Sequence, residues 1–414
     1  MPSIARVARI RENVPMSILR AFGSGLLAVF VCAFAATEAR AQKDGWQIQV
    51  TPYNEVFPSL DLSQSSRARK ASGEGGAQVI GAGNGLVTVQ LTARHDDERV
   101  HLEILSPATL TAPSQLDAVL GKAGQSYDLH PTLSWDARRL VAQVRATTAT
   151  LTFVLRRDAD KPLQRELDVS VRPLNEALYF VRDGADTVDL SWIFAAFVNE
   201  NDAVVDRLLE LGTQSGIVDG FGGYAGASTD DAMRQAWAIW HALSARGIRY
   251  SGADPGVDHG PHVFSQRVRF LADTWNDRSA NCIDGSALLA SALQRVGLRS
   301  FLVLVPGHAL VGFYTDASAR HAVYLETTLL GTRAPPLANL PGYAEDVDTS
   351  AATRASLAGF EAALRAGAAR HARVATKLDG NHRPDYAIID IPAAREYGIQ
   401  PIVLPSASVV VGTR

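Results

Sequence analysis

Hydrophobic positions follow two different periods along this chain. From Trp46 to about Arg172, apolar residues alternate with polar ones or form short runs, with Gly, Asp, Ser and Pro between them. Such runs predict β-strands, and their succession favours an all-β, immunoglobulin-like sandwich. The Gly-, Ser- and Arg-rich stretch 63–85 is expected to form a long loop.

Beyond residue 185 the period changes, because apolar residues recur at steps of three and four. Two stretches, 190–212 and 230–246, are therefore predicted to be helices. The Thr-Asp-Asp sequence that starts at Thr229 supplies an N-cap for the second helix, and Gly247 supplies its C-terminal stop.

The two patterns place a domain boundary near residue 185. We expect an α+β protein with a β-sandwich over residues 42–185 and a second domain over 186–414. A length of 414 residues suits two domains, each large enough to bury its own core. Within the second domain, the Gly-, Pro- and Asp-rich stretch 252–262 predicts a loop, and 265–275 predicts a short helix or turn.

The N-terminal residues 1–41 have the composition of a signal peptide. Several arginines precede the apolar run 21–36, and a small-x-small pattern ends at Ala41. Sixteen apolar residues are few for a helix that needs about 20 to cross a bilayer, although an uncleaved anchor is the alternative. We expect export to the periplasm or beyond, with membrane contact only through this segment if it is retained. Phe30 and Val31 stand where lipid modification of Cys32 would require small residues.

Removal of the signal segment would also remove one of the cysteines, Cys32. The chain has two cysteines, so the mature chain would keep only Cys282 and could form no intrachain disulfide. In an oxidising compartment, a single thiol is either a buried inert residue or a reactive group.

The residues around Cys282 favour a reactive group. Cys282 opens an apolar-periodic run that ends at Gly297, which places the thiol in the first turn of a helix, where the backbone favours an anion. Three strands are predicted next, at 300–305, 308–314 and 322–328. His308 begins the second strand, and Glu326 lies within the third. If these two strands pair, the carboxylate can orient the imidazole, and the imidazole can activate the thiol.

These residues resemble the transglutaminase-like superfamily, whose core is a papain-type fold. The resemblance rests on three motifs and a helical lead-in: Asn281-Cys282-Ile283-Asp284-Gly285, Pro306-Gly307-His308-Ala309, Tyr324-Leu325-Glu326-Thr327-Thr328 and the stretch 236–250. It implies a helix carrying Cys282 packed on an antiparallel sheet, with Cys282 as nucleophile, His308 as base and an acid as its partner. The superfamily usually has Asp where this chain has Glu326. The backbone N–H of Cys282 and the side chain of Gln266 are the candidates for oxyanion stabilisation.

Other polar residues have simpler interpretations. Asp284 is an alternative partner for His308, but its place in the first helical turn is explained by the helix dipole. Asp258, His259 and His262 are candidate metal ligands in the predicted loop, but their spacing is irregular and no fourth ligand is evident. Trp275 either walls a substrate cleft or packs internally. The remaining side chains considered are expected to be surface or core residues: Asp258, His259, His95, His101, His130, Trp237, Trp240 and His241.

The C-terminal part is expected to be an accessory extension without chemistry of its own. It contains a predicted surface helix at 353–369 and a predicted strand at 386–391.

The sequence thus favours an exported thiol enzyme that acts on amide bonds through an acyl-enzyme at Cys282. Resolution by water would give a peptidase or amidase, which we favour, and resolution by an amine would give a transglutaminase. The alternative is an inactive scaffold that serves as a binding or assembly module. The expected substrate is a protein or peptide, with cell-wall peptides among the candidates. No metal, nucleotide or flavin signature suggests a cofactor, and a formal net charge of −3 argues against nucleic acid as a partner.

Overall fold

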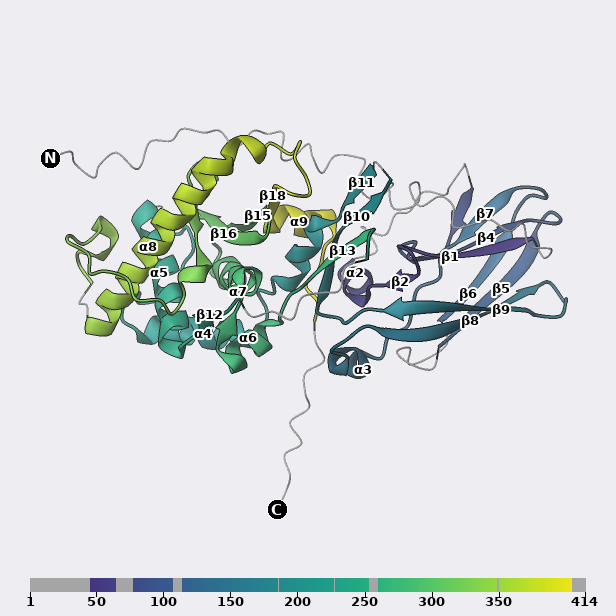
Figure 1. Ribbon diagram of the computed structural model, residues 1–414, viewed down its shortest axis with the longest axis horizontal. Coiled ribbons are helices and arrows are strands. Elements are labelled where there is room, and N and C mark those ends of the chain that lie inside the picture. Colours follow the sequence, from purple (N-terminus) through teal and green to yellow (C-terminus); the bar gives the residue numbers. More distant parts are fainter. Residues whose placement is uncertain are drawn as a thin grey trace, which may run out of the picture.

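The computed structural model describes residues 45–64, 77–106, 114–184, 186–226, 228–252, 260–347 and 350–403. The predicted signal segment, with Cys32, lies outside these residues, as do Asp258 and His259. A β-rich part and a helical part lie side by side, with a small sheet between them (Figure 1).

Two sheets make up the β-rich part. One has the order β1-β4-β7-β3 and the other β2-β9-β8-β5-β6. Alternate side chains from both sheets, such as Val89, Leu102 and Phe153, are fully buried in one apolar cluster. The strands are β1 (Trp46–Val50), β2 (Glu55–Val56), β3 (Gln78–Ile80), β4 (Val87–Thr92), β5 (Glu98–Leu105), β6 (Ser114–Leu120), β7 (Ser126–Leu129), β8 (Thr147–Arg157) and β9 (Leu163–Val171).

The loop predicted over 63–85 is wrong in part. Within it, β3 pairs in parallel with β7, and Gly81 and Gly83 lie so close to the backbone after β7 that a Cβ at either would meet it. The glycines that suggested a loop therefore permit a close approach of two chain segments. Residues 65–76 lie outside the described part.

A three-stranded sheet, β11-β10-β13, connects the two parts. It consists of β10 (Glu176–Asp183), β11 (Asp186–Asp189) and β13 (Val263–Arg267). The boundary expected near residue 185 falls between β10 and β11, which pair with each other. Leu60 of the short helix α2 (Pro58–Leu62) also joins the core of the helical part, as does Leu140 of α3 (Ala137–Ala142). The two parts are therefore packed against each other through apolar contacts.

The helical part departs from its predicted elements at two places. The helix expected at 190–212 is divided into η3 (Ser191–Phe197) and α4 (Ala203–Gln214), because the side chains of Asn199 and Asp202 accept backbone N–H groups and start a new helix. The stretch 265–275 begins as strand β13 and becomes helix only at α6 (Leu271–Asp277).

The helix predicted at 230–246 is confirmed as α5 (Thr229–Arg246). Its N-cap is Ser228, one residue before the expected Thr229, and Gly247 ends it in a left-handed conformation with φ of +80°. Trp237 and Trp240 of α5 are buried core residues, as expected.

The last sheet has the order β17-β16-β15-β18 and is antiparallel throughout. Helix α7 (Cys282–Arg295) packs on one face, where Val311 and Phe313 belong to the main core. The long helix α8 (Ala351–Val374) packs against the edge strand β17 (Figure 1). The strands are β15 (Ser300–Val305), β16 (His308–Tyr314), β17 (Ala322–Leu325) and β18 (Ala387–Asp390).

The C-terminal extension thus completes the fold. It supplies edge strand β18, the covering helix α8 and the short helix α9 (Ile391–Tyr397). The smaller remaining elements are β12 (Arg249–Tyr250), β14 (Ser279–Ala280), η4 (Thr327–Leu329), η5 (Gly342–Ala344) and η6 (Ala375–Lys377).

The expected α+β class is confirmed at the level of a mixed fold with several sheets. Within the described ranges, every helix is too short or too polar to cross a bilayer.

Candidate active site

Cys282 is the first residue of helix α7, as the sequence predicts. The Asn281 side chain caps this helix by accepting the N–H groups of Ile283 and Asp284, at 3.0 and 2.9 Å. Asp284 returns the contact by accepting the N–H of Asn281 at 3.0 Å, which completes a capping box. This cap does not use the N–H of Cys282, which therefore remains a candidate oxyanion donor. The Cys282 side chain is neither fully buried nor fully exposed.

The first turn of α7 is also tied to the segment that carries Glu326. The carbonyl of Cys282 accepts hydrogen bonds from Ser286 Oγ at 2.7 Å and from Thr327 Oγ1 at 3.2 Å. The backbone of Cys282 is thus fixed relative to η4.

His308 begins β16 directly after a two-residue turn. Gly307 in that turn has φ of +69°, a value that glycine adopts without strain, and Val305 pairs with His308 across the hairpin. The imidazole is placed by a rigid hairpin and is only 13% exposed.

Glu326 lies one residue beyond β17, which ends at Leu325 and not at 328 as expected. Leu325 pairs with Val311, so Glu326 comes close to the start of β16 diagonally across the ladder. Its carboxylate oxygens lie 3.0 and 2.9 Å from Nε2 of His308. Because Nε2 faces the carboxylate, Nδ1 is the ring nitrogen left for the thiol.

The surroundings of His308 favour its charged form. Burial lowers the pKa of His308, but hydrogen bonds and charge interactions with Cys282 and Glu326 outweigh burial and raise the pKa from 6.5 to about 9. Burial raises the pKa of Glu326, but its hydrogen bonds to His308 and Thr328 bring the net value below the ordinary one. Cys282, His308 and Glu326 thus form a connected set of side chains in which an imidazolium is stabilised at neutral pH.

Glu326 has two further partners. Oε1 accepts a hydrogen bond of 2.8 Å from the hydroxyl of Thr328, and Oε2 accepts one of 3.0 Å from Nε of Arg370. Arg370 belongs to α8, in the extension for which the sequence predicted no chemistry, so that prediction missed a contact with the site. The residues around an arginine on an amphipathic helix do not indicate whether its side chain binds a group outside that helix.

Gln266 lies in a strand, whereas the sequence predicted a short helix or turn over 265–275. It lies in β13, paired with Ala177 of β10, and its Nε2 donates to the carbonyl of Arg267 at 2.9 Å. Both the backbone N–H of Cys282 and the side chain of Gln266 stay candidates for oxyanion stabilisation.

The structure gives Asp284 and Trp275 other partners. Asp284 accepts the N–H of Arg269 at 2.8 Å in addition to its capping contact, so its carboxylate is engaged away from His308. Trp275 is buried beneath the guanidinium of Arg246, 4.9 Å from the ring centre, which favours internal packing over a role in a cleft wall.

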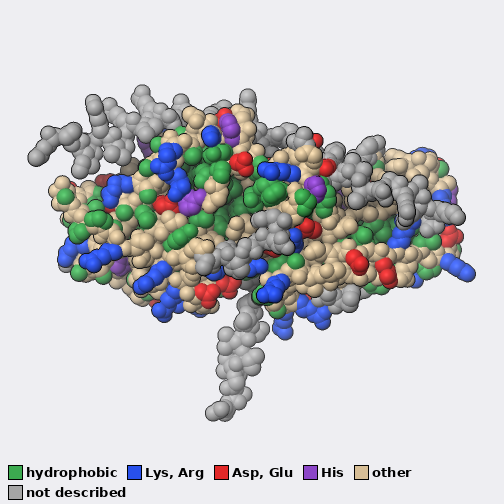
Figure 2. All heavy atoms as spheres, in the orientation of Figure 1, with side chains coloured by type: hydrophobic (Ala, Val, Ile, Leu, Met, Phe, Trp, Pro, Cys, Tyr) green, Lys and Arg blue, Asp and Glu red, His purple; other side chains and the backbone are tan. Residues whose placement is uncertain are grey.

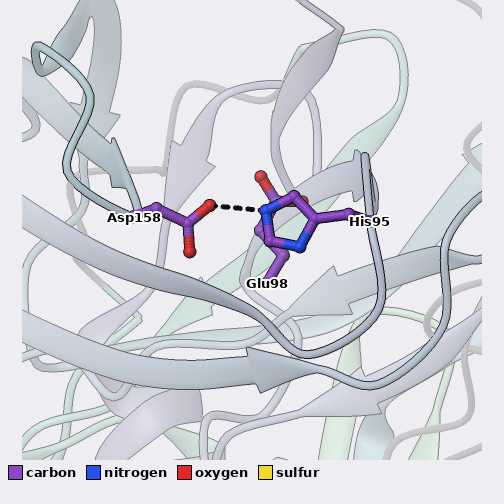
Figure 3. Close-up of side chains that lie close together, drawn as sticks. All are labelled: His95, Glu98 and Asp158. Atoms are coloured by element: carbon purple, nitrogen blue, oxygen red, sulfur yellow. Dashed lines mark hydrogen bonds and ion pairs between the residues drawn. The ribbon is translucent and has the colours of Figure 1, made fainter.

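Three side chains in the β-rich part form a second cluster of candidate ligand atoms. His95, Glu98 and Asp158 place such atoms within 4.8 Å of one another (Figure 3). However, Arg157 donates to both oxygens of Glu98, at 2.8 and 2.7 Å, and Arg94 adds a third contact of 2.6 Å. These guanidinium groups neutralise the carboxylates and repel a cation, so the cluster is better explained as an ion-pair network.

Figure 2 shows apolar side chains gathered near the middle of this face of the molecule, with Lys and Arg side chains beside them.

No protein-family model matches this chain, and no match was found among curated proteins.

Proposed function

We propose that this protein is an exported thiol enzyme of the transglutaminase-like type, which cleaves amide bonds in a protein or peptide. The observation that carries the proposal is the position of His308, which interacts with the thiol of Cys282 and the carboxylate of Glu326 at once. A nucleophile, a base and a group that orients the base are the components that covalent acyl transfer requires.

The reaction follows from these positions. The Cys282 thiolate adds to the amide carbonyl carbon, and the backbone N–H of Cys282 donates to the developing oxyanion. The carbon–nitrogen bond then breaks, and the leaving amine takes a proton from the His308 imidazolium. Water adds to the resulting thioester as His308 accepts its proton, and cleavage of the carbon–sulfur bond releases the carboxylic acid and the thiolate.

Glu326 keeps Nδ1 of His308 directed at the sulfur and stabilises the imidazolium between these steps. Its extra methylene relative to Asp suits its position beyond the end of β17, where it reaches His308 diagonally. Hydrolysis is preferred to amine transfer because water is always present. Cell-wall peptides fit the proposed export and are among the candidate substrates.

The fold assignment belongs to the same proposal. A helix that starts at the nucleophile and packs on an antiparallel sheet is the arrangement expected of a papain-type core. The two sheets around a shared core in the first part support a β-sandwich, which we expect to help position the substrate.

The test is to treat the protein with iodoacetamide and to map the modified residues by mass spectrometry, with Cys282→Ser as the control. We expect modification of Cys282 in the native fold, and a loss of rate in His308→Gln. Failure of Cys282 to react while circular dichroism shows a native fold would refute the proposal. If Cys282→Ala restores the phenotype of a gene deletion as well as wild type does, the protein acts as a binding or assembly module instead.

A further inference from the structure

The carboxylate of Glu326 is held by three elements that are far apart in the sequence. His308 comes from β16, Thr328 from the turn that follows Glu326, and Arg370 from α8. Oε1 accepts from His308 and from the hydroxyl and the N–H of Thr328, and Oε2 accepts from His308 and Arg370, so neither oxygen can move without breaking at least two contacts. Glu326 itself is only 3% exposed.

We propose that Arg370 is a positioning residue of the active site, which fixes the Glu326 carboxylate against His308 and offsets part of its negative charge. The inference rests on the proposed function and adds the C-terminal helix to the working site.

Contacts on both sides of Arg370 fix α8 against the segment that carries Glu326. Gly367 lies so close to β17 that a Cβ there would meet the carbonyl of Tyr324. His371 stacks on the ring of Tyr324, with ring centres 4.0 Å apart. The N–H of Glu326 also donates to the carbonyl of Ala363 at 3.1 Å. The guanidinium is therefore delivered by a helix whose position over β17 is set by the backbone itself.

The charges around His308 give Arg370 an effect that a purely structural residue would lack. The titratable groups in contact with His308 are Cys282 of α7 and Glu326, and Arg370 binds the same oxygen of Glu326 as His308 does. A positive charge there opposes a second positive charge on the imidazole. Removal of the Arg370 charge should therefore raise the pKa of His308 further, because Glu326 would then face the imidazolium alone.

The test compares Arg370→Gln and Arg370→Lys with wild type. Arg365→Gln is the matched control, because Arg365 lies on the same helix, is mostly exposed and pairs with Glu361 instead. The titration of His308 is followed by NMR of 13C-labelled histidine, with His308→Gln to assign the signal. The rate of Cys282 alkylation by iodoacetamide is measured over the same pH range.

We expect Arg370→Gln to raise the His308 midpoint by about one pH unit. Arg370→Lys, which keeps the charge, should stay closer to wild type, and Arg365→Gln should match wild type. A residue that only stabilised the fold would change the fraction of native protein without moving the midpoint. A midpoint in Arg370→Gln that equals or falls below that of wild type, in a natively folded variant, would overturn the inference. If wild-type Cys282 does not react at all, the proposed function fails, but the NMR titration still decides the role of Arg370.

Discussion

Shortening Glu326 by one methylene should disconnect it from His308, although the superfamily that this chain resembles uses the shorter Asp. In Glu326→Asp the carboxylate withdraws by about 1.3 Å, roughly the projection of one C–C bond. The contacts to Nε2 of His308, now 3.0 and 2.9 Å, would lengthen to about 4 Å, beyond hydrogen-bonding range. The backbone cannot easily follow, because the N–H of Glu326 is held by the carbonyl of Ala363.

The magnitude follows from the pKa of His308. A rise from 6.5 to about 9 corresponds to a preference for the imidazolium on the order of 3 kcal/mol, to which Cys282 and Glu326 both contribute. Loss of the Glu326 hydrogen bond should lower the pKa of His308 by about one unit or more. Glu326→Gln keeps the length but removes the charge, so it should lower this pKa as well. The two variants thus test reach and charge in turn, and each should lower the pKa of His308.

The assay is an NMR titration of His308 in wild type and both variants, with the alkylation rate of Cys282 measured in parallel. We expect a lower His308 midpoint and slower alkylation near neutral pH in both variants. Glu326→Asp with a wild-type midpoint and a wild-type rate would refute the claim that this carboxylate holds the imidazole.

Three further predictions concern stability. Asn281→Ala removes the capping side chain of α7 and should cost about 1 kcal/mol in urea unfolding, whereas Asn281→Ser should retain most of the stability. His130 is fully buried, and burial lowers its pKa below 6.5, so its neutral form is favoured in the fold. The contribution of neutral His130 to the free energy of unfolding should therefore be fully present above about pH 6.5. It should decrease as the pH falls below that value, because His130 binds a proton more readily in the unfolded chain than in the fold. His130→Leu should show a smaller loss between about pH 7 and pH 5; an unchanged pH dependence would contradict this account. Gly367→Ala should lower the melting temperature, because the added Cβ displaces α8 from the backbone of Tyr324. The displacement should also slow the alkylation of Cys282. A wild-type melting temperature and a wild-type alkylation rate would show that the structure accommodates a Cβ at residue 367.

The local elements of the site were predictable because local rules determine them. The apolar period and the polar residues at its start predicted that Cys282 opens a helix, and the structure confirms this through the Asn281 cap. The turn at Pro306-Gly307 likewise predicted that His308 begins a strand, which is β16. The pairing of the hairpin then brings Glu326 to His308.

The remaining contacts depend on packing between distant segments, which a single sequence does not reveal. Arg370 follows Glu326 by 44 residues and meets it only because α8 covers the edge of β17. Gln266 lies in a strand and not in the expected helix or turn because β13 pairs with β10, a partner almost 90 residues earlier. The split of the helix at 190–212 arose from side-chain capping at Asn199 and Asp202, which the apolar period does not register.

The central claim is that His308 activates the thiol of Cys282 while Glu326 holds the imidazole. The most direct measurement is the rate of Cys282 alkylation by iodoacetamide at neutral pH in wild type and in His308→Gln, with Cys282→Ser as the control. We predict that wild-type Cys282 reacts and that His308→Gln slows this reaction while the fold is preserved. A wild-type Cys282 that does not react, or an equal rate in natively folded His308→Gln, would contradict the account.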